Sequence, residues 1–422
     1  MSSPTASRAP VLALGPVLAL ALDGAGWHPA AWRDPDSGAA GVFTAGHWAA
    51  TVRTAEAGGI DFVTLEDSLG LQASCPEGPD GRTDRVRGRL DALLVANAVA
   101  PLTGRIGLFP TVTTTHTEPF HTATGLQTLD YTSRGRAGWQ VRVSAAAHEA
   151  AHFGRRHLPA DQVSRVGELF REAREAVEVA RRLWDSWEDD AIIRDTSTGR
   201  FIDRDKVHYA DFEGEFFSVK GSSITPRSPQ GQPLVAVSAA GPRGYALAAD
   251  TADIVFTVPR DDAEAAATLA AVRAAEAGAG RPGSGWFGRG LSVYADVLVL
   301  IEDTPEAARA ELERLDALAG EPLVSDARIF AGTAAELADL VRAWTALGFE
   351  GFRFRPARTV RDTAAIARDL VPLLAASPFA QAGTGVVPET GAETLRERLG
   401  FGRPASRYAA SSTTPATEEI SA

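Results

Sequence analysis

The sequence predicts an α/β fold, a closed (β/α)8 barrel with an excursion after the fourth βα unit. Eight short apolar runs occur in order along the chain, and a stretch with the three- and four-residue period of a helix follows each of them. Strands that alternate with helices form parallel sheets, and eight such units are enough to close a barrel. The eight runs are Val11–Leu22, Ile60–Leu65, Ile106–Val112, Trp139–Val143, Leu234–Val237, Asp253–Val258, Leu291–Ile301 and Gly351–Phe354.

The first run is apolar enough to resemble the core of a signal peptide. A Gly-Pro pair interrupts it, however, and it leads directly into Asp23, so we interpret it as a buried strand that feeds a polar loop. The stretches 1–9 and 404–422 are rich in Ser, Thr, Ala and Pro and have no apolar period. We therefore expect disordered tails on either side of one domain, residues 10–403.

The third run and the helix after it show the pattern of one unit most clearly. Ile106–Val112 leads into hydroxyl residues at positions 111 and 113–115, where α/β barrels place their ligands. Pro119 falls in the first turn expected of the next helix, where its missing N–H costs nothing. The stretch 133–138 contains two glycines and ends that helix before Trp139–Val143 re-enters the sheet.

Helix signals mark the later units as well. Thr304-Pro305-Glu306 has a cap, a proline and an acid in the favoured order. Thr333 and Glu336 have the spacing of a capping box, and Gly348 is expected to end that helix. A longer helix is expected where apolar residues recur on one face. They are Val166, Leu169, Phe170, Ala173, Val177, Ala180 and Leu183.

The largest interruption of the repeat is the polar stretch 189–232. It contains a hairpin pattern, FEGEFFSVKG, and a turn-rich PRSPQGQP. Connections of this length are uncommon in compact domains unless they have a function or a structure of their own, so we expect an excursion over the catalytic end of the barrel. It is either a structural flap or a direct contact to the substrate.

Composition limits the partners. A net charge of −12 lacks the surplus of Lys and Arg that nucleic acids and anionic membranes require, so neither is expected as a partner. No segment of the sequence is long and apolar enough to cross a membrane. The single Cys75 excludes an intramolecular disulfide and a cysteine-rich metal site, which agrees with a cytoplasmic protein.

Barrel enzymes act at the carboxyl ends of their strands, and this rule selects eleven polar candidates. They are Asp23, His28, Glu66, Asp67, Ser68, Thr111, Thr113, His116, Gln140, Arg142 and Ser144. Glu66 and Asp67 could act as paired acids. Successive strand residues point to opposite sides, however, so the two carboxylates are not expected to share a proton.

The sequence offers residues for two other kinds of site. His116, Glu118 and His121 could ligate a metal, but Pro119 divides them between a loop and a helix. Their spacing is not that of a metal-binding helix, so no metal is expected. A Ser-His-Asp relay is not supported either, because the sequence has no GxSxG nucleophile elbow.

Five linked stretches carry a family resemblance. They lie at 27–35 (WHPAAWRDP), 60–69 (IDFVTLEDSL), 107–144, 184–233 and 394–408, and the third contains TxTTTxxEPFH followed by LDYxSxGRAGW. In order and spacing they resemble the nitrilotriacetate-monooxygenase branch of the bacterial-luciferase-like flavin enzymes. The resemblance covers most of the chain.

The resemblance implies a barrel that takes reduced FMN from a separate flavin reductase and uses it with O2 to oxygenate a small organic substrate. It also implies a homodimer. Asp67 matches an acid that ends the second strand and helps hold the flavin, and Thr111 matches a hydroxyl residue at the end of the third strand that contacts it. Gln140 stands where the family usually has Asn, so we include it among the cofactor-binding residues.

The chain departs from the family pattern at other positions. Ala160 and Ser164 replace a His and a Tyr, and Ala239-Ala240-Gly241 replaces a Gly-Ser-Ser that offers hydroxyl donors to the FMN phosphate. Arg243, in the expected first turn of the next helix, could supply the lost interaction together with the dipole of that helix. The region 302–330 is short, which predicts a more open barrel mouth.

Two other functions remain open. A non-catalytic barrel subunit that pairs with an active paralogue is favoured by the lost His, Tyr and Ser side chains. A deazaflavin-dependent oxidoreductase is possible because related barrels use that cofactor. The retained Asp67 and the stretch 189–232 favour the monooxygenase.

Overall fold

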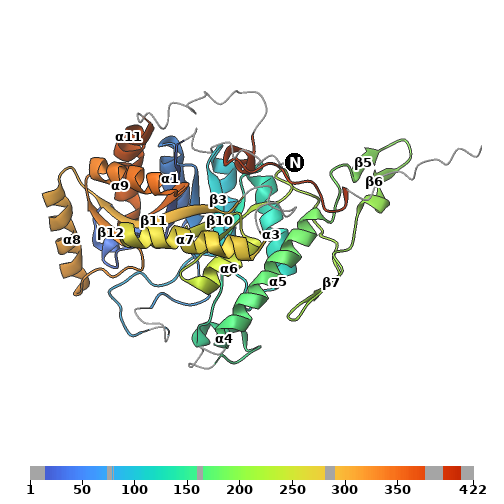
Figure 1. Ribbon diagram of the computed structural model, residues 1–422, viewed down its shortest axis with the longest axis horizontal. Helices are drawn as coiled ribbons and strands as arrows, with labels where there is room; N and C mark the ends of the chain where they lie inside the picture. The colour runs from blue at the N-terminus through green and yellow to red at the C-terminus, as the bar shows by residue number, and fades with distance from the viewer. Residues whose placement is uncertain are drawn as a thin grey trace, which may run out of the picture.

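A closed barrel of eight parallel strands forms the centre of the molecule in a computed structural model (Figure 1). The structure describes residues 15–73, 78, 80–158, 165–280, 290–375 and 393–409, so the predicted tail 1–9 and Cys75 lie outside it. Each of the eight predicted runs provides one barrel strand, which confirms the fold. They are β1 (Val17–Leu22), β2 (Phe62–Leu65), β3 (Gly107–Thr113), β4 (Gly138–Arg142), β9 (Leu234–Ser238), β10 (Ile254–Thr257), β11 (Ser292–Ile301) and β13 (Gly351–Pro356).

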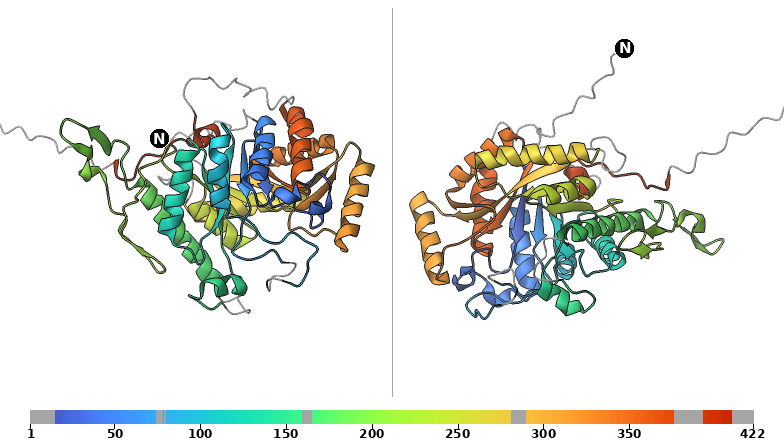
Figure 2. Two further views of the ribbon diagram at one scale, coloured as in Figure 1. Left: turned by 180° about the vertical axis from the view of Figure 1, so that it is seen from behind. Right: turned by 60° about the horizontal axis from the view of Figure 1, so that its bottom comes forward.

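Helices cover the outside of the barrel (Figure 2). The α-helices of the described residues are α1 (Ala45–Ala57), α2 (Ala92–Val99), α3 (Pro119–Thr132), α4 (Ala147–Phe153), α5 (Val166–Asp185), α6 (Pro242–Thr251), α7 (Asp262–Gly278), α8 (Pro305–Ala319), α9 (Ala334–Leu347), α10 (Thr359–Ala365), α11 (Val371–Ala375) and α12 (Leu395–Arg398), the last of which lies at one end of the barrel. The capping box of Thr333 with Glu336 forms as predicted, and α9 ends at Gly348. No helix among the described residues combines the length and the apolar character needed to cross a bilayer.

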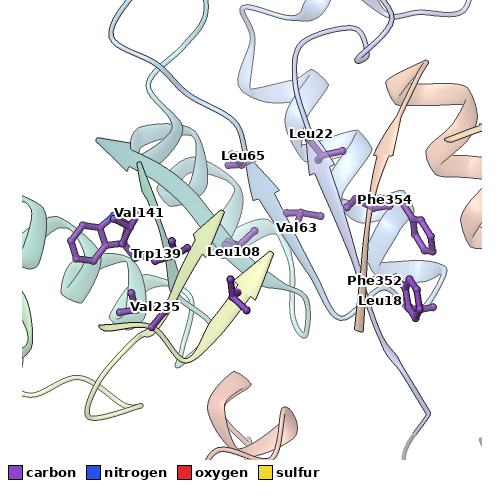
Figure 3. Packing of buried hydrophobic residues seen from close by; sticks show 14 of the residues in the cluster. Leu18, Leu22, Val63, Leu65, Leu108, Trp139, Val141, Val235, Phe352 and Phe354 are labelled. Carbon is purple, nitrogen blue, oxygen red and sulfur yellow. The ribbon is translucent and has the colours of Figure 1, made fainter. Parts of the chain in front are cut away.

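The largest core lies between the barrel and the helices. Alternate strand residues point outward into it, including Phe352 and Phe354 on β13 and Trp139 and Val141 on β4 (Figure 3). The residues between them point into the barrel, as the period of two in a strand requires. A second apolar cluster fills the lower part of that interior. Its members include Phe62, Phe109, Leu234, Ala236, Ile254, Phe256 and Tyr294.

The N-terminal end of the barrel is closed by α12. Leu395, which is fully buried, belongs to the same apolar cluster as Phe62, and its side chain lies against Gly107 at the start of β3. Further along the chain, the Ser406 hydroxyl donates to the backbone carbonyl of Asp185 at the end of α5. This contact ties the segment after α12 to α5, and the structure describes that segment as far as residue 409.

The excursion at 189–232 lies at the opposite end of the barrel from the one that we predicted. It joins the end of α5 to the start of β9, and the Gln230 side chain accepts from the backbone N–H of Arg396 in α12. A helix in a βα unit returns the chain to the N-terminal ends of the strands, so a connection after a helix lies there and not over the catalytic end.

The predicted hairpin is nevertheless present in the excursion. It consists of β7 (Phe212–Glu213) and β8 (Ser218–Val219), and a second hairpin joins β5 (Ile192–Asp195) to β6 (Arg200–Ile202). The β5 and β6 hairpin projects beyond α5, away from the barrel strands, in both figures of the whole chain (Figures 1 and 2).

One strand was not predicted. β12 (Arg328–Gly332) pairs in parallel with the second half of β11, residues Val297–Ile301. The region 302–330 therefore contains α8, which the sequence indicates, followed by the start of a ninth strand in the same sheet. The middle of β12 is the apolar sequence Ile-Phe-Ala, in which apolar and polar residues do not alternate. A run this short therefore does not indicate a strand.

Candidate functional site

Polar side chains from several strands meet inside the barrel above the apolar cluster. At their centre is Arg353 on β13, whose side chain is only 1% exposed. Its guanidinium donates to Asp296 Oδ1 at 2.8 Å, to Gln140 Oε1 at 2.6 Å and to Ser238 Oγ at 3.2 Å. Its Cζ also lies 3.9 Å from the ring centroid of Phe256, where a cation is attracted by the π face.

Two arginines share one buried carboxylate. Asp296 on β11 accepts hydrogen bonds at Oδ2 from Arg353 at 2.5 Å and from Arg355 at 2.6 Å. Burial by itself would raise the pKa of Asp296, but the charges of the two arginines outweigh this effect and hold the pKa below its ordinary value. The Asp296 carboxylate is therefore ionised, and it neutralises part of the positive charge inside the barrel.

Glu66 connects this group to β2. Its Oε1 accepts from the Thr64 hydroxyl at 2.8 Å, and its Oε2 accepts from Gln140 Nε2 at 3.0 Å. Gln140 thus has both ends of its amide occupied, one by Glu66 and the other by Arg353. We define Glu66, Gln140, Asp296, Arg353 and Arg355 as the barrel network.

Asp67 turns away from Glu66, as strand alternation predicts. Its Oδ1 accepts from the backbone N–H of Ser68 at 2.7 Å, and its Oδ2 accepts from the N–H of Ala92 at 2.9 Å, at the start of α2. Burial raises the pKa of Asp67 to about 6, although the hydrogen bonds from Ala92 and Ser68 act in the opposite direction. The two acids do not form a proton-sharing pair.

Thr111 and Gln140 are neighbours in the sheet. They are partners in the parallel register of β3 and β4, and Thr111 is 3% exposed. The Thr111 hydroxyl oxygen is buried and has no hydrogen-bond partner within the described residues. An unpaired buried hydroxyl is uncommon, so this group is free to bond to a ligand.

Arg142, Thr113 and Ser144 form a second polar group beside α4. Arg142 donates to the Thr113 hydroxyl at 3.2 Å and makes two bonds of 2.9 Å to Glu149. The backbone N–H of Ser144 donates to the Thr115 hydroxyl at 3.1 Å. These contacts fix the loop after β4.

The remaining candidates have separate surroundings. His28 lies against α8, where its Nε2 is 3.0 Å from Asp316 and its Nδ1 accepts from the N–H of Ala30. Burial lowers its pKa and so favours a neutral, structural imidazole. Burial raises the pKa of Asp23, which faces Arg89 and Glu66.

The three residues considered as metal ligands do not converge. His116 has a positive φ of 73° and stacks on Phe153 with 5.2 Å between the ring centroids. Glu118 is paired with Arg155 at 2.7 Å, and His121 lies on α3 beside a phenylalanine. In the described part of the chain, no three His, Cys, Asp or Glu side chains gather in a way that could hold a metal ion.

The predicted phosphate region lies at the start of α6. Gly241 precedes the helix with φ of 83°, and no side chain caps the first N–H groups. Ala240 and Arg243 are exposed, and Arg243 makes no ion pair or hydrogen bond to the residues that the structure describes. Ala160 and Ser164 lie outside the described residues.

Asp296, Arg353 and Arg355 were not among the predicted site residues. Two signals could have revealed them. Asp296 is the only charged residue in the ten-residue run of β11, and GFRFRP alternates aromatic with basic side chains, which sends both arginines to one face of β13.

A closed (β/α)8 barrel with buried charges and hydroxyls at the carboxyl ends of its strands belongs to the class of barrel proteins that bind ligands at that end. The chain is a member of the luciferase-like monooxygenase family, whose model matches residues 26–369. This match confirms the resemblance seen in the sequence.

Individual relatives agree with the family. The chain is 34% identical to N-acetyl-S-(2-succino)cysteine monooxygenase of Bacillus subtilis over 71% of its own length, and 34% identical to nitrilotriacetate monooxygenase component A of Aminobacter aminovorans over 69%. In each case the matched stretch spans 64% of the relative. The crystal structure of a long-chain alkane monooxygenase shares the fold, with a TM-score of 0.78 at 22% identity over 92% of this chain and 95% of that one.

Proposed function

We propose that the protein is a two-component flavin-dependent monooxygenase that receives reduced FMN from a separate flavin reductase and oxygenates a small organic substrate with O2. Family membership supports an oxygenase, and the name component A of one relative supports a division of labour between two proteins. The observation that carries the proposal is the unpaired, buried Thr111 hydroxyl beside Gln140 at the barrel mouth.

The residues present fit a flavin. Leaving a buried hydroxyl unbonded costs roughly 1–3 kcal/mol, and the carbonyl oxygens and ring nitrogens of FMN would accept from Thr111. The phosphate of FMN needs N–H groups or a cation if it is to leave water. The uncapped start of α6 after Gly241 offers such N–H groups, and Arg243 is an unpaired cation in the same helical turn.

Each predicted residue then has a distinct task. Thr111 donates to the flavin ring, and Arg243 with the start of α6 holds the phosphate. Asp67 fixes the beginning of α2 through Ala92, and Gln140 is held in place by Glu66 and Arg353. The reduced flavin, when bound, supplies the reaction with O2, while the barrel orients the substrate and excludes water.

Anaerobic titration with reduced FMN tests this function. We expect saturable binding, and Arg243→Ala should weaken it by about ten- to a hundredfold, because charge-assisted bonds to phosphate contribute about 1.5–3 kcal/mol. Arg260→Ala is the matched control. Arg260 is also exposed, lies just before the next helix, α7, and pairs with Glu264 instead of standing free. Its loss should leave binding unchanged.

A second function has one observation in its favour. Asp67 and Gln140, two of the four predicted cofactor contacts, already have hydrogen-bond partners within the protein, as a non-catalytic subunit would. If the wild type binds neither reduced FMN nor a reduced deazaflavin at sub-millimolar concentration, the protein is a non-catalytic subunit and not an enzyme. Preference for the deazaflavin would indicate the related oxidoreductases instead. By family resemblance we also propose a cytoplasmic homodimer.

A further inference from the structure

A separate cavity lies beside the barrel mouth. It has a volume of about 150 Å³ and is formed by the loop after β1 together with Gln72, Ala73 and residues 85–87. Asp23, Trp27, His28, Gln72, Arg85 and Arg87 are among its lining residues. A protein cavity of this size accommodates a group as large as benzene, about six non-hydrogen atoms.

Two arginines in the cavity wall have unused donors. Arg85 pairs with Glu321 through Nη2, and Arg87 pairs with Asp80 through its own Nη2. Arg87 Nε also donates to the backbone carbonyl of Arg82 at 3.3 Å. The remaining Arg85 Nε and Arg87 Nη1 are buried and find no acceptor within the described residues. Each guanidinium is therefore held in place by one carboxylate and keeps an N–H group for a ligand.

Other polar side chains of the wall have hydrogen-bond partners within the protein. The indole N–H of Trp27 donates to the carbonyl of Ala21 at 2.7 Å, and that of Trp32 donates to the carbonyl of Asp84 at 2.9 Å. Gln72 uses both ends of its amide on the backbone of Gly88. The tryptophan rings therefore present apolar surface, which suits the hydrocarbon part of a ligand.

The charge near the cavity favours a single negative charge. Residues 80–89 contain four arginines and two aspartates, and Glu321 adds one more negative charge, so the segment with Glu321 carries a net charge of +1. A monoanion would neutralise it. A dianion would exceed it.

The cavity is close to the barrel network. Asp23, which lines it, is near enough to Glu66 for their charges to interact, and Glu66 bonds to Gln140 at the mouth. The cavity therefore lies beside the residues where the flavin is proposed to bind.

We infer that this cavity binds the carboxylate group of the substrate, through Arg85 Nε and Arg87 Nη1, and that the substrate is a small organic carboxylic acid. Two N–H groups from two cations match the two oxygens of a carboxylate. The role as substrate rests on the proposed function, but the binding of a carboxylate does not. The phosphate of FMN is the other anion that such donors could bind.

Butyrate and butyramide test the assignment, because each has six non-hydrogen atoms and only butyrate carries a charge. Ligand-observed NMR at millimolar concentration should show at least tenfold tighter binding of butyrate to the wild-type chain. Arg85→Gln and Arg87→Gln should each abolish this preference. Arg82→Gln is the matched control. Arg82 lies in the same segment and pairs with Asp84 and Glu321, but it does not line the cavity. It should change butyrate affinity less than twofold.

Val86→Phe tests whether butyrate binds in the cavity itself, because an effect of the arginine variants could also come from disorder of the segment. Val86 lines the cavity, and the larger side chain should block butyrate while both arginines keep their partners. Equal binding of butyrate and butyramide, or tight butyrate binding in Arg87→Gln, would overturn the inference. Displacement of butyrate by inorganic phosphate of equal or higher affinity would also overturn it and assign the cavity to the FMN phosphate.

The two proposals fail separately. Saturable binding of reduced FMN without any preference for butyrate contradicts the cavity assignment and leaves the flavin function standing. Arginine-dependent butyrate binding without any flavin binding supports the cavity and contradicts the flavin function.

Discussion

Arg353 and Asp296 form an ion pair that is shielded from water, with Nη2 and Oδ2 2.5 Å apart and side chains 1% and 0% exposed. The pair joins β13 to β11, which are also neighbours in the sheet. Because Arg353 continues to Gln140 on β4, the same side chain spans the width of the barrel interior. The network is thus a cross-link between strands that lie on different sides of the barrel.

Removing one charge of the barrel network should lower the free energy of unfolding. Asp296→Asn leaves Arg353 and Arg355 buried with too little negative charge, so the free energy of unfolding should fall by about 3–5 kcal/mol. Urea denaturation measures this change. Asp339→Asn is the control, because its pair with Arg342 is exposed and should contribute less than about 1 kcal/mol. An Asp296 variant that loses no more than the control would contradict a stabilising role.

Thr111→Val should separate binding from stability. The Thr111 hydroxyl has no bond within the described protein, so its replacement by a methyl group of similar shape should leave the free energy of unfolding unchanged or slightly higher. Affinity for reduced FMN should nevertheless fall by about five- to tenfold, since one hydrogen bond contributes about 1 kcal/mol. In Thr113→Val, by contrast, a bond to Arg142 is lost and stability should drop. Unchanged FMN affinity in Thr111→Val would exclude Thr111 from the cofactor site.

Asp67 should make the free energy of unfolding depend on pH between about pH 4 and 6. Its pKa rises from an ordinary 3.8 to about 6 in the folded protein. Between pH 4 and 6 the folded state then binds more protons than the unfolded state, so the free energy of unfolding falls as the pH rises, by at most about 3 kcal/mol. Asp67→Asn should remove this dependence. A carboxyl-carbon NMR titration midpoint near pH 4 would show that burial does not control the group.

Leu395→Ala tests the closure of the barrel by α12. Leu395 is fully buried in the lower apolar cluster, and truncation of such a side chain costs about 2–5 kcal/mol. Thermal or chemical denaturation should therefore show a marked loss of stability. Leu347→Ala on α9, where the side chain is 45% exposed, should have a small effect. Equal effects would mean that α12 is not part of the cooperative core.

The barrel could be predicted from sequence because each strand carries its own local signal. β1, β2 and β3 are short apolar runs followed by helices with caps or a first-turn proline, and these features depend only on nearby residues. β12 has no such signal, since it is short and half-exposed and depends on β11 for its partner. Its pairing is a property of the tertiary structure.

The site was predicted less completely for a related reason. Thr111 and Gln140 could be placed together because both end neighbouring strands. Arg353 comes from more than 200 residues later, and only closure of the barrel brings it to Gln140. The prediction for the stretch 189–232 was wrong because length and polarity do not indicate an end of the barrel, whereas a position between α5 and β9 does.

The position of α12 at the end of the sequence determines when the barrel interior can be covered during synthesis. Phe62, Phe109 and Leu234 face the N-terminal end of the barrel, and the segment that covers them, with Leu395 and Phe401, is synthesised after every barrel strand. A nascent chain that has completed all eight strands therefore still exposes an apolar opening. Exposed apolar surface of this kind promotes aggregation, so α12 would remove that risk only when it docks at the end of synthesis.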